Sequence, residues 1–367
     1  MNIIDIKCEN VKRILGYLGR HPGITKRALT EATNLSFSTV SNLCNDMKDA
    51  GVLKEEKIND YSVGRNPSQL FFMADRFYAI CMDVQGTQFF RVAVWDFSPQ
   101  RLYESRVDIG GIRDAQELLS LMEELCASLA ASPEFQKGAF VGIGISIDGI
   151  YDQGMKKIVG SSLPLLNGIP LAELLSARLK LPCFVDKASN FCAVSARQLH
   201  PDYNNILYLY GASTLDLGVI CGGELFRGHR GFTAEIAHLP FGNPEIRCPV
   251  CGNYGCIENE LSLSGMSRLS SPELTEEGRS MLLQDRGRCL GRLLSVLTSL
   301  FVPEAIFIGG SAFSCYDAVL PYAMEVVRQR CDSHLSGGLP IFHDPDSRRV
   351  IETGITQAVY ASWNPLK

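Results

Sequence analysis

The hydrophobic pattern of the first fifty residues predicts three short helices. Apolar residues recur at helical spacing over residues 11–18, and the sequence His21-Pro22-Gly23 then ends that helix. Thr25 is a suitable N-cap for a second helix, and the polar turn 33–36 separates this helix from a third. Gly51 ends the third helix. Two helices joined by a short turn are typical of a helix-turn-helix motif.

The third helix has one apolar and one polar face. Val40, Leu43 and Met47 recur at i, i+3 and i+7, so this side is expected to be buried. The opposite face carries short hydrogen-bonding side chains that suit contacts with phosphates or base edges in a major groove. We expect these residues to contact DNA: Ser38, Thr39, Ser41, Asn42 and Asn45.

A short hairpin follows the third helix. Residues 52–55 and 68–72 favour strands, and the polar segment between them carries Arg65 near the expected tip. An arginine there is placed to enter a minor groove or contact a phosphate. We therefore predict a winged helix-turn-helix DNA-binding domain over residues 1–72. The alternative is a three-helix packing module that does not touch DNA.

The remaining chain, residues 73–367, alternates strand and helix patterns in two rounds. Because strands and helices alternate and several strands end in glycines, we expect an α/β body of two halves, with helices on both faces of each sheet and a ligand cleft between the halves. The first round has strands at 78–84, 89–95, 140–147 and 183–185 and helices at 114–131 and 171–179; the second has strands at 206–210, 217–220 and 305–310 and a helix at 287–300.

Composition and charge restrict the possible classes of protein. The 46% apolar content and the net charge of −5 exclude gross disorder and a protein that coats nucleic acid over its whole surface. Residues 1–72 nevertheless carry ten Lys/Arg against eight Asp/Glu, whereas residues 73–367 carry 25 against 32. This difference indicates that only the N-terminal part meets an anionic partner.

The sequence also suggests a compartment. No uncharged apolar stretch is long enough to span a membrane, and the first twenty residues carry six charged side chains, so no signal-peptide core is expected there. We therefore expect a cytoplasmic protein without a membrane partner. The thirteen cysteines, an odd number spread over the chain, fit reduced thiols better than a disulfide framework.

Three of these cysteines form a candidate metal site. Cys248, Cys251 and Cys256 lie within nine residues, and His238 precedes them by ten. Three thiolates and an imidazole suit tetrahedral Zn²⁺, and because all four positions would be filled, the ion would be structural. The alternatives are reduced surface thiols or a redox pair formed by Cys248 and Cys251.

Several motifs resemble the ROK family, which contains bacterial sugar-responsive repressors and sugar kinases. Thr233-Ala234-Glu235-Ile236-Ala237-His238 is similar to the family motif Ala-Gly-Glu-x-Gly-His. The run from Cys251 to Glu258, with Ser262 after it, is similar to the family's zinc signature, although two residues, not one, separate Cys248 from Cys251. The resemblance implies an actin-like, hexokinase-like ATPase fold for residues 73–367, with the zinc loop at 238–256. The helix-turn-helix implies the repressor branch, because the kinases lack it.

The same resemblance implies an effector pocket. In the family, residues matching Glu235, His238 and Glu258 contact sugar hydroxyls, and the histidine also binds zinc. We expect these three side chains to line the pocket together with Ser162, Asp186 and Asn190. Ser162 stands where the family has a sugar-binding asparagine. Lys187 could favour an acidic or phosphorylated sugar, or the pocket could be vestigial.

The resemblance also indicates that catalytic groups are missing. The aspartate that accepts the proton of the sugar hydroxyl aligns with Ala188, which cannot accept one. Asp186 would share the face of Ala188 on a strand, but it matches a different family residue. The segment 212–218 retains one glycine of the family's phosphate turn, Gln85 replaces a glycine of the other, and Gly309-Gly310 is retained. We therefore predict a protein that is not an enzyme.

The sequence thus predicts a transcription regulator, specifically a repressor of carbohydrate-related genes. We expect it to bind a palindromic double-stranded DNA operator as a homodimer or tetramer, and to sense a sugar or sugar phosphate between its lobes. Two alternatives remain: a sugar kinase with a DNA-binding domain, and a zinc-stabilised DNA-binding scaffold that responds to no ligand.

Overall fold

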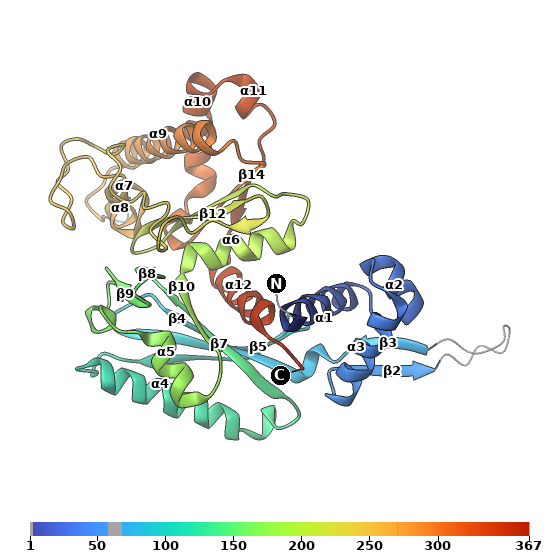
Figure 1. The fold of residues 1–367 in the computed structure, drawn as a ribbon. Coiled ribbons are helices and arrows are strands. Elements are labelled where there is room, and N and C mark those ends of the chain that lie inside the picture. Colours follow the sequence, from blue (N-terminus) through green and yellow to red (C-terminus); the bar gives the residue numbers. More distant parts are fainter. Residues whose placement is uncertain (1–2, 58–67, 270, 367) are drawn as a thin grey trace.

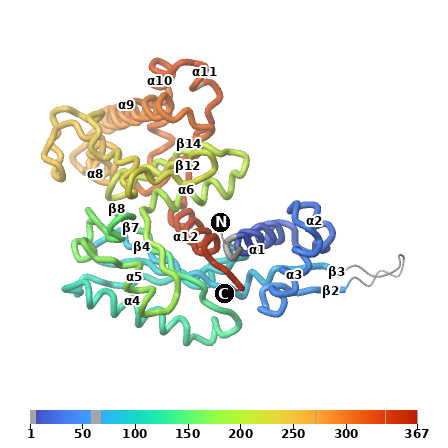
Figure 2. The backbone as a smooth tube through the Cα atoms, viewed as in Figure 1, coloured from blue at the N-terminus to red at the C-terminus, as the bar shows by residue number. Residues whose placement is uncertain are grey.

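The computed structural model describes residues 3–57, 68–269 and 271–366. They form an N-terminal module and two larger lobes (Figures 1 and 2). No helix in these ranges is long and apolar enough to cross a membrane.

The N-terminal module has the predicted winged helix-turn-helix architecture. Thr25 caps the second helix and Ser36 the third through side-chain bonds to the amides of Ala28 and Thr39. The hairpin strands pair in register, and the short first strand joins them in the order β1-β3-β2. Arg65 lies outside the described residues. The elements are α1 (Ile3–Arg20), β1 (Ile24–Thr25), α2 (Lys26–Thr33), α3 (Phe37–Asp49), β2 (Leu53–Lys57) and β3 (Ser68–Phe72).

Glu55 of β2 connects the hairpin to the helices. Its carboxylate accepts hydrogen bonds from Lys48 of α3 and Ser68 of β3, and Lys26 of α2 lies 3.6 Å away. The bonds from Lys48 and Ser68 lower the pKa of Glu55 to about 2. Because this value lies below the usual value of about 4.3, the stabilisation is present at neutral pH and is lost as pH falls through 4 towards 2.

We expect Glu55→Gln to destabilise the hairpin by about 1–3 kcal/mol at pH 7 and by much less at pH 3, where the wild-type carboxylate loses part of its advantage. The measurement is amide hydrogen exchange of β3 in the full chain at both pH values. Glu56→Gln, at the neighbouring exposed position, is the matched control. Equal exchange of β3 in both variants would show that Glu55 does not hold the hairpin.

The first lobe is a five-stranded sheet with the order β10-β7-β4-β5-β6. Strand β7 lies between β4 and β10 and is parallel to both, whereas β4, β5 and β6 are antiparallel. Helices α4 and α5 pack on one face of this sheet. The elements of the lobe are β4 (Phe77–Val84), β5 (Phe89–Asp96), β6 (Arg101–Asp108), α4 (Ala115–Ala131), β7 (Ala139–Ile147), β8 (Ile150–Asp152), β9 (Lys157–Val159), α5 (Leu171–Leu179) and β10 (Cys183–Lys187).

The second lobe repeats this plan. Its sheet has the order β13-β12-β11-β14-β15, again with three antiparallel strands followed by two parallel ones, so the two predicted halves are confirmed. Helices α9 and α10 cover its outer face. The elements are β11 (Ile206–Gly211), β12 (Leu215–Cys221), β13 (Glu224–Leu225), α7 (Glu258–Leu261), α8 (Leu263–Leu269), α9 (Glu276–Phe301), β14 (Ala305–Gly309), α10 (Tyr316–Arg330), α11 (Ser333–Ser336) and β15 (Ile341–Asp344).

Among the elements that differ from the prediction, α9 and β10 bear on the site. Helix α9 begins eleven residues before the predicted residue 287, because Thr275 caps it and two glutamates occupy its first turn. Strand β10 extends to Lys187, and Ala188 is already the first residue of the next helix. The expectation that Asp186 and Ala188 share one face of a strand is therefore wrong.

Two helices exchange places between the lobes. Helix α6 (Ala188–Leu199) follows β10 of the first lobe but packs on β11 and β12 of the second, whereas α12 (Ser347–Ser362) follows β15 of the second lobe and packs on β4 and β7 of the first. The two helices also pack against each other and fill the space between the sheets (Figure 1). A change in the angle between the lobes must therefore move one helix against the other.

The end of α12 joins the body to the DNA-binding module. Tyr360, Trp363 and Leu366 pack against the core of the module. The ring of Phe77 of β4 is tilted by 41° to that of Trp363, with ring centroids 4.5 Å apart, and the ring centroid of Phe72 of β3 lies 6.1 Å from that of Tyr360. The last turn of α12 is thus in direct contact with the end of the hairpin (Figure 2).

Candidate DNA-binding face, metal centre and effector cleft

Helix α3 presents the predicted polar face to solvent. Ser38, Asn42 and Asn45 are exposed, and Thr39 and Ser41 are half-buried. The hydroxyls of Ser38 and Thr39 lie 2.9 and 2.8 Å from that of Ser36, so they also belong to the helix cap. Lys26 of α2 donates to the side-chain oxygen of Asn45 at 3.1 Å and fixes its orientation. Asn42 is therefore the exposed amide on this face that is placed best to contact a base.

Sequence reasoning missed Phe37, the first residue of α3. Its ring is 56% exposed, which is unusual for a phenylalanine beside a capped helix start. An apolar side chain at this position suits contact with a thymine methyl group. The only sequence signal was a bulky apolar residue directly after the N-cap, outside the apolar stripe of the helix.

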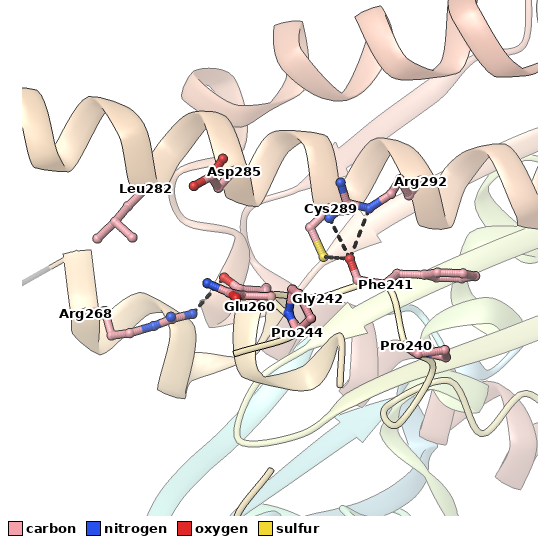
Figure 3. A pocket seen from close by; sticks show the side chains of 11 residues that line it. Pro240, Phe241, Gly242, Pro244, Glu260, Arg268, Leu282, Asp285, Cys289 and Arg292 are labelled. Carbon is pink, nitrogen blue, oxygen red and sulfur yellow. Dashed lines mark hydrogen bonds and ion pairs between the residues drawn. The ribbon is translucent and has the colours of Figure 1, made fainter. Parts of the chain in front are cut away.

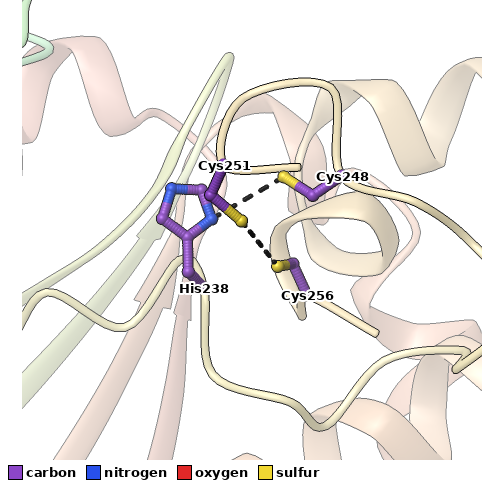
Figure 4. Close-up of side chains that lie close together, drawn as sticks. All are labelled: His238, Cys248, Cys251 and Cys256. Carbon is purple, nitrogen blue, oxygen red and sulfur yellow. Dashed lines mark hydrogen bonds between the residues drawn. The ribbon is translucent and has the colours of Figure 1, made fainter. Parts of the chain in front are cut away.

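The structure brings together all four predicted metal ligands. The donor atoms of His238, Cys248, Cys251 and Cys256 lie within 4.8 Å of one another (Figure 4). Cys248 Sγ is 3.7 Å from His238 Nδ1, and Cys251 Sγ is 3.4 Å from Cys256 Sγ. Zinc–sulfur bonds of about 2.3 Å and zinc–nitrogen bonds of about 2.0 Å place tetrahedral donors about 3.5–3.8 Å apart. The four side chains therefore fit a tetrahedral metal ion.

Local backbone geometry forms the cysteine loop. Gly252 and Gly255 both have φ of +76°, a conformation that other residues rarely adopt, and they turn the chain so that the thiols converge. Two backbone bonds close the turn: Cys248 N to Asn253 O at 2.7 Å and Gly252 N to Cys248 O at 3.0 Å.

Helix α9 anchors the segment between His238 and the cysteines. Cys289 Sγ and Arg292 Nε donate to the carbonyl oxygen of Phe241 at 3.3 and 3.0 Å (Figure 3). A cavity of about 340 Å³ lies here, also lined by Glu260 and Arg268, which pair at 2.7 Å. None of the predicted effector residues lines it, so we assign its residues to positioning the metal loop.

Asp186 and Asn190 lie together at the junction of β10 and α6. Asn190 Nδ2 donates to Asp186 Oδ1 at 2.6 Å, and Arg227 binds Asp186 Oδ2 through two nitrogens at 3.1 and 2.8 Å. Asp186 and Arg227 also line a cavity of about 320 Å³ that reaches Ala358 of α12. The side-chain oxygen of Asn190 is buried and has no hydrogen-bond partner among the described residues, so it can still accept a hydrogen bond from a ligand.

Lys187 is the unexpected feature of this region. Its Nζ contacts Asp216 Oδ1 at 2.8 Å, Glu235 Oε1 at 3.0 Å and the carbonyl oxygen of Thr233 at 3.0 Å. Burial lowers the pKa of Lys187, but the two carboxylates outweigh burial and leave the pKa above its usual value. An ammonium group has three N–H donors, so all of them are used. Lys187 thus has no donor left for an acidic or phosphorylated sugar.

His238 and Glu258 meet beside the metal centre. His238 Nδ1 is 4.0 Å from Glu258 Oε2, and burial raises the pKa of Glu258 above its usual value. Ser162 lies elsewhere: its hydroxyl and amide both bond to Asp148. The structure therefore forms two groups from the predicted effector residues, one around Asp186 and Lys187 and one around His238, with Ser162 paired separately.

The segments that resemble the family's phosphate turns line a small cavity. Gln85, which replaces a glycine, donates to Asp83 at 2.5 Å, and both residues line a cavity of only about 200 Å³. Close packing explains why two glycines are retained. A Cβ atom on Gly218 would collide with the carbonyl group of Ser189, and a Cβ atom on Gly310 would collide with the backbone of Gly211. Ala188 is buried at the start of α6 and offers no proton acceptor.

Comparisons with known proteins agree with this architecture. The model of the ROK family matches residues 79–346, and that of the MarR family matches residues 10–59. The xylose repressor of Bacillus subtilis (strain 168) is 25% identical over 363 residues, which cover 91% of each chain.

Two solved structures show the same fold. A ROK family transcriptional regulator described as a homolog of the Escherichia coli MLC protein superposes with a TM-score of 0.83 at 19% identity, covering 97% of both chains. The ROK hexokinase from Thermus thermophilus superposes with a TM-score of 0.60 at 21% identity, covering 76% of this chain and 96% of the hexokinase. The body therefore has a hexokinase-like fold, and the module before it is a MarR-like winged helix-turn-helix. Because the family model spans most of the chain and both lobes, the protein belongs to the ROK family.

Proposed function

We propose that this protein is a DNA-binding transcriptional repressor of carbohydrate-related genes, whose ROK body senses a sugar and does not phosphorylate it. The observation that carries the proposal is the exposed polar face of α3 on a module that packs directly against the end of α12. The similarity to the xylose repressor over nearly the whole chain supports the same function. We take residues 1–72 as the DNA-binding domain and 73–367 as the sensing body.

The proposed DNA contacts are of two kinds. Asn42, with Ser38, Thr39, Ser41 and Asn45 beside it, would read base edges or phosphates in a major groove. Arg65, expected from the sequence near the tip of the hairpin, would add a contact outside that groove. Because one winged module covers a short site, we propose that a homodimer or tetramer binds two half-sites of a palindromic operator.

The proposed effector residues are the six that the resemblance indicated, although Ser162 lies apart from the other five: Ser162, Asp186, Asn190, Glu235, His238 and Glu258. We favour a neutral sugar over a sugar phosphate. Lys187 and Arg227 are already paired, the first with Asp216 and Glu235 and the second with Asp186. An additional phosphate would therefore meet an excess of negative charge.

We propose that the metal is a structural Zn²⁺ bound by His238, Cys248, Cys251 and Cys256. When bound, the ion would fix the orientation of the His238 ring and thereby the nitrogen that faces away from the metal. All four positions are taken by protein ligands, so the ion would have no open position for a substrate.

The test combines two assays on the full chain. We expect sequence-specific retardation of DNA from the promoter regions beside its gene, weakening steeply with salt, and no ADP release from ATP over a panel of hexoses, pentoses and N-acetylated sugars. The loss of the general base alone costs about 10²–10⁴ in rate. Sugar-dependent ADP release would establish the alternative, a sugar kinase. Absence of specific retardation at every neighbouring promoter would contradict the repressor.

A further inference from the structure

Lys187 connects the two lobes through a buried ammonium group. It is the last residue of β10 in the first sheet, whereas Asp216 lies on β12 of the second sheet and Glu235 lies in the segment after β13. The Lys187 side chain is only 2% exposed. A buried ammonium group is costly without partners, so its contacts with two carboxylates and the Thr233 carbonyl must form together.

Two further ion pairs attach the same segment to the first lobe. Arg227 binds Asp186 of β10, and Arg230 binds Asp152 of β8. A backbone hydrogen bond joins the same two segments: the amide of Gln153 donates to the carbonyl oxygen of Arg230 at 2.8 Å. The two guanidinium groups are 44% and 40% exposed, so water screens their pairs, whereas the ammonium of Lys187 is shielded from solvent.

We propose that Lys187 is an internal tether that holds the two lobes of the cleft together. The Lys187 ammonium group binds the carboxylates of Glu235 and Asp216, which could otherwise accept hydrogen bonds from the hydroxyl groups of a ligand. In this arrangement Lys187 takes the place of such a ligand. The carboxylates of Asp216 and Glu235 are therefore partly neutralised by the chain itself. The inference concerns the cleft to which the proposed function assigns the effector, but it does not depend on DNA binding.

The test is hydrogen exchange of the Gln153 amide in the full chain, without DNA and without ligand. In the wild type, we expect this amide to exchange at least about 100-fold more slowly than an unprotected amide. In Lys187→Met, we expect exchange at least tenfold faster than in the wild type, with the amides of β5 and β6 unchanged. Lys187→Arg should retain much of the protection, and Lys137→Met, at an exposed lysine of the first lobe, should match the wild type.

A second variant covers the case in which Lys187→Met does not fold. In Lys187→Met/Asp216→Asn the less exposed carboxylate is neutral, while Glu235, 46% exposed, can be hydrated. This folded variant should show the same loss of Gln153 protection. Wild-type exchange at the unprotected rate, or unchanged exchange in either folded variant, would overturn the tether. Failure of DNA retardation would count only against the proposed function, because neither DNA nor ligand enters this experiment.

Discussion

Asn42→Ala is expected to lower the affinity for the operator about 10–100-fold without unfolding the module. Asn42 is exposed on α3, and the apolar residues that hold the helix lie on its opposite face. A side-chain amide that binds a base edge contributes about 1–3 kcal/mol of discrimination, which corresponds to that loss. Fluorescence anisotropy with a labelled operator duplex measures it directly.

The salt dependence of binding distinguishes a contact with a base from an electrostatic contact with a phosphate. A lost base contact relaxes sequence preference but leaves the slope of affinity against salt unchanged, whereas a lost phosphate contact lowers the slope. Lys137→Ala in the first lobe serves as the control and should bind DNA like the wild type. Wild-type affinity and specificity in Asn42→Ala would show that α3 does not read the operator through this residue.

Cys256→Ser is expected to remove the metal and to cause the largest loss of stability of any single substitution considered. The Cys256 side chain is buried beside Ile257, which belongs to the core of the second lobe. Metal binding stabilises such loops strongly, since apparent zinc-binding free energies reach about 10–16 kcal/mol in small zinc domains. We expect metal analysis to give one zinc per wild-type chain and much less in the variant, with a lower melting temperature.

Cys221→Ser is the matched control, because Cys221 is exposed and lies outside the metal cluster. It should retain both the metal and the wild-type melting temperature. A strong chelator should lower the melting temperature of the wild type and of Cys221→Ser alike, and leave that of Cys256→Ser unchanged. Full metal content in Cys256→Ser would contradict the proposed ligand set.

Local patterns predicted the DNA-binding module and many elements of the body, because their causes are local, but they did not identify β6, α6, α10, β15 or α12. The caps at Thr25 and Ser36, the apolar stripe of α3 and the glycines of the metal loop act within a few residues. The thiols and His238 are also close in sequence, so their convergence could be anticipated. The two-lobed fold followed from the repeated alternation of strands and helices.

The chemistry of the cleft could not be predicted from local patterns, because it depends on distant partners. Lys187 and Glu235 are 48 positions apart, and Arg227 lies 41 positions from Asp186. The sequence drew attention to Lys187 as a possible ligand contact. It could not show that all three N–H donors of Lys187 are bonded within the protein. The end of β10 was misplaced for a similar reason, because packing of α6 on the second sheet fixes where the strand stops.

The exchange of α6 and α12 suggests how the cleft could affect DNA binding. The first turn of α6 carries Asn190 and follows Asp186 and Lys187 directly, and α6 packs along α12. The last turn of α12 carries Tyr360, and Trp363 follows it into the core of the module. Movement of the lobes therefore has a continuous path of packed side chains to the DNA-binding helices.

The most direct test of the central claim is selection of DNA from a random duplex library by the purified full chain. The account predicts enrichment of one inverted repeat, with half-sites about one helical turn or a multiple of it apart. The retarded complex should weaken as salt increases, and Asn42→Ala should fail to enrich the same sequence. If the folded, metal-loaded chain enriches no common sequence, the claim that the ROK body regulates a sequence-specific DNA-binding module is contradicted.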